Sequence, residues 1–379
     1  MRIAVVHSFY STAQPSGENV VVDEQAAALT AAGHEVHVVA RRTDDEVGGW
    51  FYPLRAGTRV ATGRGASPDE ELAAIGPQVV HLHNTFPNFG TRWLDTWGPR
   101  TVTTLHNYRT VCAAGTLFRD GHECHDCLSR PVVPAVRHRC YRGSRLATAP
   151  VALGAMPGGG LRRVLTQSAR LLTLNKEQAR VISASTGKVV DVVPNFVGTG
   201  TQRKPEERWA YVGRLAADKG ILELLEVWPS DEPLDVFGEG DLGEHLRGRF
   251  GEQPNVSFAG KVSRNDLLAR LGAYRGLIVP SQWSEGLPTV ILEALARGVP
   301  SVVSRSLAAG RELEDAGVSV RLPNSRVLTD DLVAATVKIR EQGDTMRHAC
   351  VALHSRRYSA TSWLASVTPI YEAVASGST

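Results

Sequence analysis

Two glutamates in the segment SQWSEGLPTVILEALARGVP, residues 281–300, have a spacing that suits an extended ligand. Glu285 precedes an expected helix in which Pro288 suits the first turn, where its missing N–H costs nothing. Glu293 follows eight positions later, about 12 Å away at ~1.5 Å per residue. Free N–H groups at a helix start favour an anion such as a diphosphate, and Gly286 lets that backbone come close. The simpler alternative is a solvated glutamate pair.

Two cations earlier in the chain strengthen the ligand-binding interpretation. In YVGRLAADKG, Arg214 and Lys219 directly follow a predicted strand at residues 209–212. Ligands of doubly wound sheets bind at this end of the strands, and two cations there can neutralise a leaving diphosphate. Together the four side chains favour a nucleotide-sugar site in the C-terminal half.

Elements that could position these residues repeat in both halves. The loop-helix-strand alternation predicts two α/β units with parallel, doubly wound sheets. Expected strands lie at residues 3–6, 35–40, 79–83, 101–106, 209–212, 234–237, 277–279 and 299–304, and expected helices at 18–32, 221–228 and 358–374.

Bulk properties narrow the class of protein. A chain of 379 residues suggests two domains, and a net charge of +3 is too small to indicate a nucleic-acid partner. The first residues, MRIAVV, lack the pattern of a signal peptide. The uncharged stretch 146–161 is short for a membrane span and is interrupted by prolines and glycines. We expect a cytoplasmic protein, with peripheral membrane contact as an open alternative.

Several segments resemble glycosyltransferase family 4, the retaining GT-B enzymes. In the C-terminal half these are YVGRLAADKG, VFGEGDL, FAGKV and PSQWSEGLPTVILEALARGVPSV, and the N-terminal half adds PSGE and GHEVHVV. The resemblance covers nearly the whole chain and implies two Rossmann-like domains facing across a cleft. Residues 1–196 would form the acceptor side, 197–357 the nucleotide-sugar domain, and 358–379 a helix packing back toward the N-terminal domain. Two departures are Ser16, where members often carry glycine, and Phe196 in PNF, where PNG is commoner.

The resemblance also implies roles for individual residues. The reaction would move a sugar from a UDP-sugar, or alternatively a GDP-sugar, to a hydroxyl acceptor such as a glycan, glycolipid or natural-product aglycone, in carbohydrate biosynthesis. Catalytic roles fall to Arg214, Lys219, Glu285 and His106, with the two cations at the diphosphate and Glu285 at the donor sugar. Donor contacts fall to Gly17, Lys261, Val262, Gly286, Leu287 and Glu293, the last on the ribose hydroxyls.

The predicted mechanism is front-face attack, in which the leaving phosphate takes the acceptor's proton. No nucleophile–base pair emerges from the motifs, and no Asp-x-Asp motif sits in a donor loop, so no metal or other cofactor is required for catalysis. The acceptor cleft is expected to be lined by strand-end residues of the N-terminal half, each of which has a ligand-free loop role as its alternative. These residues are His7, Tyr10, His83, Asn84, Asn107, Tyr108 and Arg109.

Other functions on the same architecture remain as alternatives. A sugar-nucleotide epimerase would act on the donor alone, and a nucleotide-sugar-binding subunit would lack catalysis. A glycogen-type phosphorylase needs a much longer chain. The intact set of Arg214, Lys219, Glu285 and Glu293 argues against the non-catalytic alternative.

A cysteine cluster marks an insertion at about residues 112–140. Cys112, Cys124, Cys127 and Cys140 include a C-x2-C knuckle, the spacing of a structural zinc site. A reducing compartment favours zinc over free or redox-active thiols, and those over disulfides. Three histidines could substitute as ligands: His122, His125 and His138.

Overall fold

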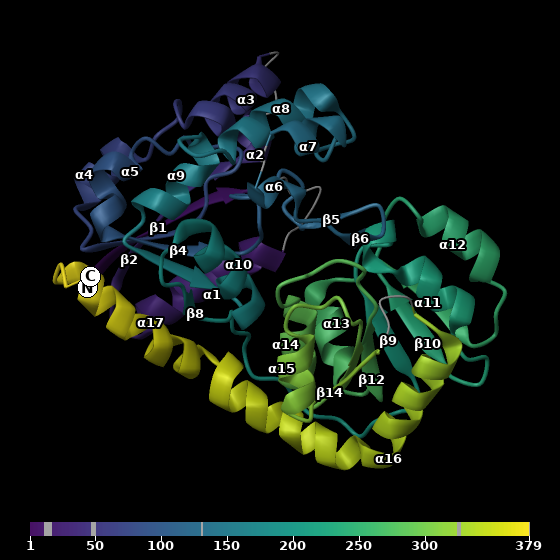
Figure 1. The fold of residues 1–379 in the computed structure, drawn as a ribbon. Coiled ribbons are helices and arrows are strands. Elements are labelled where there is room, and N and C mark those ends of the chain that lie inside the picture. Colours follow the sequence, from purple (N-terminus) through teal and green to yellow (C-terminus); the bar gives the residue numbers. More distant parts are fainter. Residues whose placement is uncertain (11–16, 47–50, 130–131, 324–326, 379) are drawn as a thin grey trace. The chain divides into compact units, whose positions relative to one another are not determined.

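The computed structural model describes residues 1–10, 17–46, 51–129, 132–323 and 327–378 (Figure 1). Contacts divide the chain into two compact units. Unit 1 contains residues 1–195 and 363–379, and unit 2 contains residues 196–362. Each unit has its own parallel sheet and its own hydrophobic core.

The main sheet of unit 1 has the strand order β2-β1-β3-β4-β7-β8, with every neighbouring pair parallel. Residues 3–6 of strand β1 (Arg2–Phe9) are fully buried, as expected for a parallel strand covered on both faces. The strands are β1 (Arg2–Phe9), β2 (Glu35–Arg42), β3 (Val79–Asn84), β4 (Thr101–Leu105), β7 (Arg170–Thr173) and β8 (Asp191–Val192), and a small antiparallel hairpin adds β5 (Phe118–Arg119) and β6 (His122–Glu123).

Helices of unit 1 connect these strands, and one of them comes from the far end of the chain. That helix, α17, carries Val367 and Tyr371 in fully buried positions, and the Tyr371 hydroxyl lies 2.7 Å from Nδ1 of His81 on β3. The unit 1 helices are α1 (Gly17–Ala31), α2 (Thr43–Glu46), α3 (Tyr52–Thr62), α4 (Asp69–Ile75), α5 (Leu94–Trp97), η1 (Gly98–Arg100), α6 (Asp126–Ser129), α7 (Val133–Arg137), α8 (Arg145–Gly154), α9 (Gly160–Gln167), α10 (Lys176–Thr186) and α17 (Ala360–Ala375).

Unit 2 repeats the architecture with the strand order β11-β10-β9-β12-β13-β14, again parallel throughout. Its strands are β9 (Trp209–Val212), β10 (Leu234–Phe237), β11 (Val256–Gly260), β12 (Gly276–Val279), β13 (Ser301–Val303) and β14 (Ser319–Arg321). Its helices are η2 (Ala217–Lys219), α11 (Ile221–Val227), α12 (Gly243–Phe250), α13 (Arg264–Leu271), α14 (Thr289–Leu295), α15 (Gly310–Asp315), α16 (Thr329–Leu353) and η3 (His354–Tyr358).

The predicted doubly wound α/β architecture is confirmed, and the eight expected strands are all present. Strands β7, β8, β11 and β14 escaped prediction because they are short or carry half-exposed, polar positions. The last helix begins at Ala360 rather than at Tyr358, because residues 354–358 form a π-helical turn.

No helix within the described ranges combines the length and apolar character that a bilayer crossing requires.

Candidate active site

The strand order in unit 2 places β9 beside β12, so the loops that follow these two strands are neighbours. From β9 the chain winds outward through β10 and β11, whereas β12, β13 and β14 extend on the other side. Ligands of such sheets bind at the carboxyl ends of the two strands where the winding reverses, here β9 and β12. Gly220 has φ +67°, and a Cβ on it would lie 2.2 Å from the Pro280 carbonyl oxygen. The loop after β9 therefore packs tightly against the loop after β12.

Lys219 and Glu285 meet at this junction. The Lys219 ammonium lies 2.5 Å from Oε1 of Glu285, and the Ser281 hydroxyl donates to Oε2 at 2.7 Å. Both carboxylate oxygens are thereby held, which fixes the orientation of the glutamate. The ammonium also lies 5.5 Å from the centre of the Trp283 ring, a cation–π distance. Of the described side chains, none accepts a hydrogen bond from the buried Trp283 Nε1.

Arg214 lies in the same loop as Lys219 and is also paired. Its guanidinium donates to Oδ2 of Asp218 at 2.9 Å and is largely exposed. The Tyr211 hydroxyl donates to the main-chain carbonyl of Arg214 at 2.8 Å. Burial, followed by the negative charges of Glu285 and Asp218, raises the pKa of Tyr211 above its ordinary value, so this hydroxyl stays protonated. Each predicted phosphate-binding cation thus has a carboxylate partner.

Glu293 is placed differently from Glu285. It lies inside α14 with 5% exposure, and Arg264, the first residue of α13, donates to its Oε1 at 2.8 Å. Pro288 directly precedes α14 rather than lying in its first turn, which corrects the predicted helix start by one residue. The two glutamates therefore have separate cationic partners.

The predicted donor residues of unit 2 that remain lie in the loops after β11 and β12. Gly286 is half-buried in the loop before α14. Leu287 is buried in the core of unit 2, and the half-buried Val262 packs against that core. Lys261, just after β11, is exposed. Leu287 and Val262 therefore offer main-chain groups at most, because their side chains serve packing.

Unit 1 has a pocket lined by residues at the carboxyl ends of β3 and β4. The lining includes five predicted residues, namely His83, Asn84, His106, Asn107 and Arg109. It also includes Glu18, which was not among the predicted site residues. Apolar lining comes from Leu82, Phe86, Leu105, Leu161 and Val164.

Four histidines run through this part of unit 1. His83 Nδ1 lies 3.0 Å from His106 Nε2 with the rings stacked, and His81 and His7 have ring centres 4.0 Å and 6.2 Å from His83. Burial first, then mutual repulsion, lowers the pKa of His106 to about 3 and that of His83 well below its ordinary value. Neutral imidazoles can donate at one nitrogen and accept at the other. Nε2 of His83 is buried without a partner among the described residues.

Glu18 supplies a carboxyl group to the pocket from the first turn of α1. Burial raises the pKa of Glu18 to about 8, and the Arg109 charge and an Asn84 hydrogen bond oppose that rise only in part. His7 Nδ1 lies 3.9 Å from its Oε1. The sequence signal for Glu18 was a glutamate directly after Gly17, at the start of the first expected helix.

Tyr108 and Tyr10, which were also predicted to line the acceptor cleft, make contacts within the fold. Tyr108 is 2% exposed and belongs to the core of unit 1, so it does not line the pocket, which corrects its prediction. The Tyr10 hydroxyl accepts a hydrogen bond from Asn84 Nδ2 at 3.0 Å. Gly17 begins α1, and Ser16 lies outside the described residues.

Arg109 is held rigidly at the rim of the pocket. Its Nη1 donates to the Ala113 carbonyl at 2.9 Å, and its main-chain N–H donates to Oδ1 of Asn107 at the same distance. The guanidinium lies 4.7 Å from the centre of the Phe86 ring and 5.4 Å from that of Tyr141.

The four clustered cysteines are free thiols close enough to influence one another. Burial, followed by Cys112, Cys140 and Cys124 in turn, raises the pKa of Cys127 to about 12. No three His, Cys, Asp or Glu side chains in the described ranges are spaced as metal ligands. The zinc prediction therefore stays a prediction, supported by the donor chemistry and not by ligand geometry.

Comparisons with known proteins agree with this arrangement. A family model described as "Glycosyltransferase Family 4" matches residues 15–200, and one described as "Glycosyl transferases group 1" matches residues 206–341. The chain is 40% identical over 95 residues to a teichuronic acid biosynthesis glycosyltransferase, TuaC of Bacillus subtilis, covering 24% of this chain and 23% of the relative. It is 30% identical over 169 residues to phosphatidyl-myo-inositol mannosyltransferase of Mycobacterium leprae, covering 41% and 44%.

Solved structures show the same fold over nearly the full length. Sucrose-phosphate synthase of Thermosynechococcus elongatus superposes with a TM-score of 0.68 at 16% identity, covering 98% of both chains. HepE of Anabaena in complex with UDP-glucose has a TM-score of 0.61 at 12% identity, covering 98% of this chain and 99% of that one. At these identities the likeness concerns the fold alone, a GT-B fold built from two parallel-sheet α/β units. With the two family models spanning residues 15–200 and 206–341, this chain belongs to glycosyltransferase family 4.

Proposed function

We propose that this protein transfers a sugar from a nucleotide-diphosphate sugar to a hydroxyl acceptor, with retention of the anomeric configuration. The observation that carries the proposal is the junction of β9 and β12, where Lys219, Glu285 and Ser281 form one hydrogen-bonded set. The segments that supply this set are the ones that match the family model. The donor is a UDP-sugar, a choice supported by the UDP-glucose complex of HepE, a protein of the same fold.

The chemistry follows from charge. Departure of the nucleotide leaves negative charge on the β-phosphate, and prearranged cations that meet this charge lower the barrier. Lys219 and Arg214 supply them, and the acceptor hydroxyl passes its proton to the departing phosphate oxygen. The bond between the anomeric carbon and that oxygen breaks as the bond to the acceptor oxygen forms on the same face. No metal or other cofactor is needed in this proposal.

Glu285 keeps the Lys219 ammonium in place before the donor arrives. The pair is mostly buried, with side-chain exposures of 18% and 16%, so the glutamate also limits the cost of burying the ammonium alone. When the diphosphate binds, the ammonium gains a second anion, and the carboxylate becomes available to sugar hydroxyls. Glu293, oriented by Arg264, is the group for the ribose hydroxyls.

The test begins with a thermal-shift panel of UDP-, GDP-, ADP- and TDP-sugars, because a ligand that binds only the folded state raises Tm. The best donor is then incubated with and without candidate acceptors, and the anomeric configuration of the product is read by NMR. A retained product that forms only with an acceptor supports the proposal. An inverted product, or conversion of the donor alone to its epimer, contradicts it.

Site variants then separate the two glutamates. Titration with UDP should show about 1–3 kcal/mol weaker binding for Glu293→Ala, the loss of a hydrogen bond to a charged group. Glu285→Ala should retain UDP affinity, because Lys219 loses a competing anion, and should lose turnover. Lys338→Ala, an exposed residue on α16, is the matched control. Equal loss of UDP affinity in both glutamate variants would contradict the division of roles.

A further inference from the structure

Unit 1 exposes large apolar side chains on three helices that pack together. Phe51, Leu54, Val133, Leu146 and Leu153 are 72%, 70%, 74%, 89% and 46% exposed. They lie at or beside α3, α7 and α8, and α8 packs against both of the other helices (Figure 1). We call these five side chains and the surrounding surface the α3–α7–α8 face. Scattered exposed apolar residues are ordinary, whereas a group on adjacent elements indicates a binding surface.

The helix geometry brings the apolar side chains of α3 and α8 onto neighbouring surfaces. A Cβ on Gly57 would lie 3.5 Å from the Pro150 ring, so these two residues mark the contact between α3 and α8. Leu54 lies one turn before Gly57, and residues three apart share a helix face. Leu146 and Leu153 lie one turn before and after Pro150 and are seven positions apart, again on one face. Leu54, Leu146 and Leu153 therefore flank the same contact.

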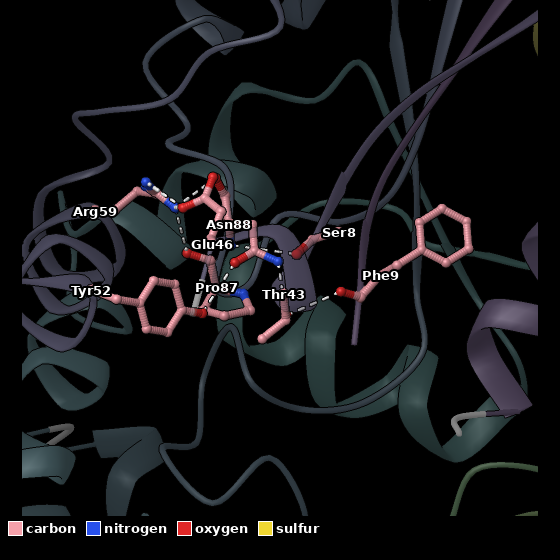
Figure 2. Close-up of polar contacts among 8 residues, drawn as sticks. All are labelled: Ser8, Phe9, Thr43, Glu46, Tyr52, Arg59, Pro87 and Asn88. Atoms are coloured by element: carbon pink, nitrogen blue, oxygen red, sulfur yellow. Dashed lines mark hydrogen bonds and ion pairs between the residues drawn. The ribbon is translucent and has the colours of Figure 1, made fainter. Parts of the chain in front are cut away.

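Figure 2 shows a polar network that holds Tyr52 and Arg59 of α3. Arg59 donates to Oε2 of Glu46 at 3.1 Å and to the Asn88 carbonyl at 2.8 Å, and the Tyr52 hydroxyl donates to Oδ1 of Asn88 at 3.2 Å. Tyr52 and Arg59 are seven positions apart and share a face, which lies about 160° around the helix from Leu54 at ~100° per residue. The network holds α3 in place, so that Leu54 stays directed toward solvent.

The two segments that form α3, α7 and α8 carry basic residues and no acidic ones. Residues 51–68 and 132–176 contain no aspartate or glutamate. The exposed arginines on or beside the three helices make no ion pair with any described residue, and they are Arg55, Arg137, Arg139, Arg142 and Arg145. Other arginines of the same segment are used within the fold, as in the pair of Arg170 with Asp191 at 2.7 Å.

We propose that the α3–α7–α8 face binds the surface of an anionic phospholipid bilayer. Protruding apolar side chains among unpaired arginines suit the boundary between lipid headgroups and acyl chains. Anionic headgroups attract the arginines, and the leucines and Phe51 enter the acyl boundary. A nucleic acid would leave the apolar side chains in water, so it matches only half of the surface. The proposal concerns a surface outside the donor site and does not depend on the proposed reaction.

The face also adjoins the pocket of unit 1 through one apolar layer. Val60 of α3, Val151 of α8 and Ala135 of α7 share a buried cluster with Phe86 and Leu161. Phe86 and Leu161 line the pocket. This buried cluster therefore separates the α3–α7–α8 face from the pocket. A bilayer bound to the face would lie close to the pocket, in a position to present a lipid-linked acceptor.

Vesicle flotation with the full chain tests the proposal. We expect binding to phosphatidylcholine vesicles with about 30% phosphatidylglycerol, and at least about tenfold weaker binding to phosphatidylcholine alone. Raising the salt from about 0.1 M to about 0.5 M should weaken the anionic binding, because it screens exposed charges. Absence of binding to the anionic vesicles at low salt, or equal binding to both compositions, would overturn the proposal.

Two double variants assign the binding to the face. Leu54→Gln with Leu146→Gln should weaken anionic binding about tenfold or more, since each replaces an exposed side chain that inserts. Arg137→Gln with Arg145→Gln should weaken it about 25-fold and reduce the preference for anionic lipid, at about fivefold for each basic residue.

Matched controls exclude a general effect of surface substitution. Val189→Gln changes an 83% exposed residue of the same unit, away from the three helices, and Arg356→Gln changes an exposed arginine of unit 2. Both should bind vesicles as the unchanged protein does, and all variants should keep its Tm because surface changes cost little. Equal loss in controls and face variants would overturn the assignment.

Discussion

Glu18 offers a quantitative test of the pocket in unit 1, through the change Glu18→Gln. Burial raises the pKa of this carboxyl from 4.5 to about 8 in the folded chain. The folded state therefore binds the proton more tightly than the unfolded state. The resulting stabilisation is fully present below about pH 4.5 and is lost as the pH rises through about 8.

The size of the effect follows from the two pKa values. Each pKa unit corresponds to about 1.4 kcal/mol, so the free energy of unfolding should fall by about 5 kcal/mol across the whole of this window from Glu18 alone. Glutamine is neutral and similar in shape, so Glu18→Gln should not show this loss. The variant should match the unchanged protein at about pH 5 and exceed its stability by about 4 kcal/mol at about pH 8.

The assay must report on unit 1 separately from unit 2. Urea unfolding followed by pulsed hydrogen exchange and mass spectrometry of peptides from β1 and α1 meets this need. The buried histidines titrate with the opposite sign, because their pKa values are lowered, and they weaken folding as the pH falls below about 6.5. They are present in both proteins, so their contribution cancels in the difference.

Glu70→Gln, on the exposed surface of α4, is the matched control for replacing one carboxylate by an amide. A flat difference for Glu18→Gln between about pH 5 and 8 would refute the reasoning, because it would mean that Glu18 ionises in the folded chain as it does in water. The same result would remove the neutral carboxyl from the pocket at physiological pH.

Three further predictions concern the donor site and the cysteines. Lys219→Ala should lower kcat about 100-fold or more with the Tm little changed, as when one oxyanion donor is lost, whereas Lys338→Ala should leave kcat unchanged. Arg264→Ala should weaken UDP binding in titration calorimetry, because Glu293 loses the partner that orients it; an unchanged Kd would contradict this. Protein purified without a polyhistidine tag should contain about one zinc per chain that Cys127→Ser loses, and four freely titratable thiols with no zinc would refute the zinc prediction.

Local patterns predicted the parts of the fold that depend on short segments. Apolar runs such as residues 3–6 and 277–279 became buried central strands, because a parallel sheet covered on both faces needs continuous apolar sequence. Strand β8, Asp191–Val192, has no such run, since it is a short edge strand anchored by its neighbour β7. Edge strands carry fewer buried positions, so the pattern that identifies them is weaker.

In the candidate site too, the sequence predicted individual residues but not their contacts with residues far away in the chain. Lys219 and Glu285 were predicted because each lies in a recognisable loop, but their ion pair joins residues 66 positions apart and depends on β9 lying beside β12. The Arg264–Glu293 pair likewise requires knowledge of how α13 and α14 lie. Tyr108 was predicted to line the acceptor cleft because it follows a strand and carries a hydroxyl. The same position and residue type also suit the hydrophobic core, which is where Tyr108 lies.

The two candidate sites differ in the charge states of their side chains. In unit 2, the cations Lys219 and Arg214 are paired with the carboxylates of Glu285 and Asp218, and we propose that a diphosphate replaces these partners when the donor binds. In unit 1, the lowered pKa values of His83 and His106 keep these imidazoles neutral, and the raised pKa of Glu18, about 8, keeps most of that carboxyl protonated near pH 7. The pocket contains one cation, Arg109, and its other polar lining groups are neutral donors and acceptors, which suit uncharged hydroxyls better than a diphosphate. We therefore propose that unit 1 binds the acceptor, and ionising Glu18 above about pH 8 should weaken acceptor use before it weakens donor binding.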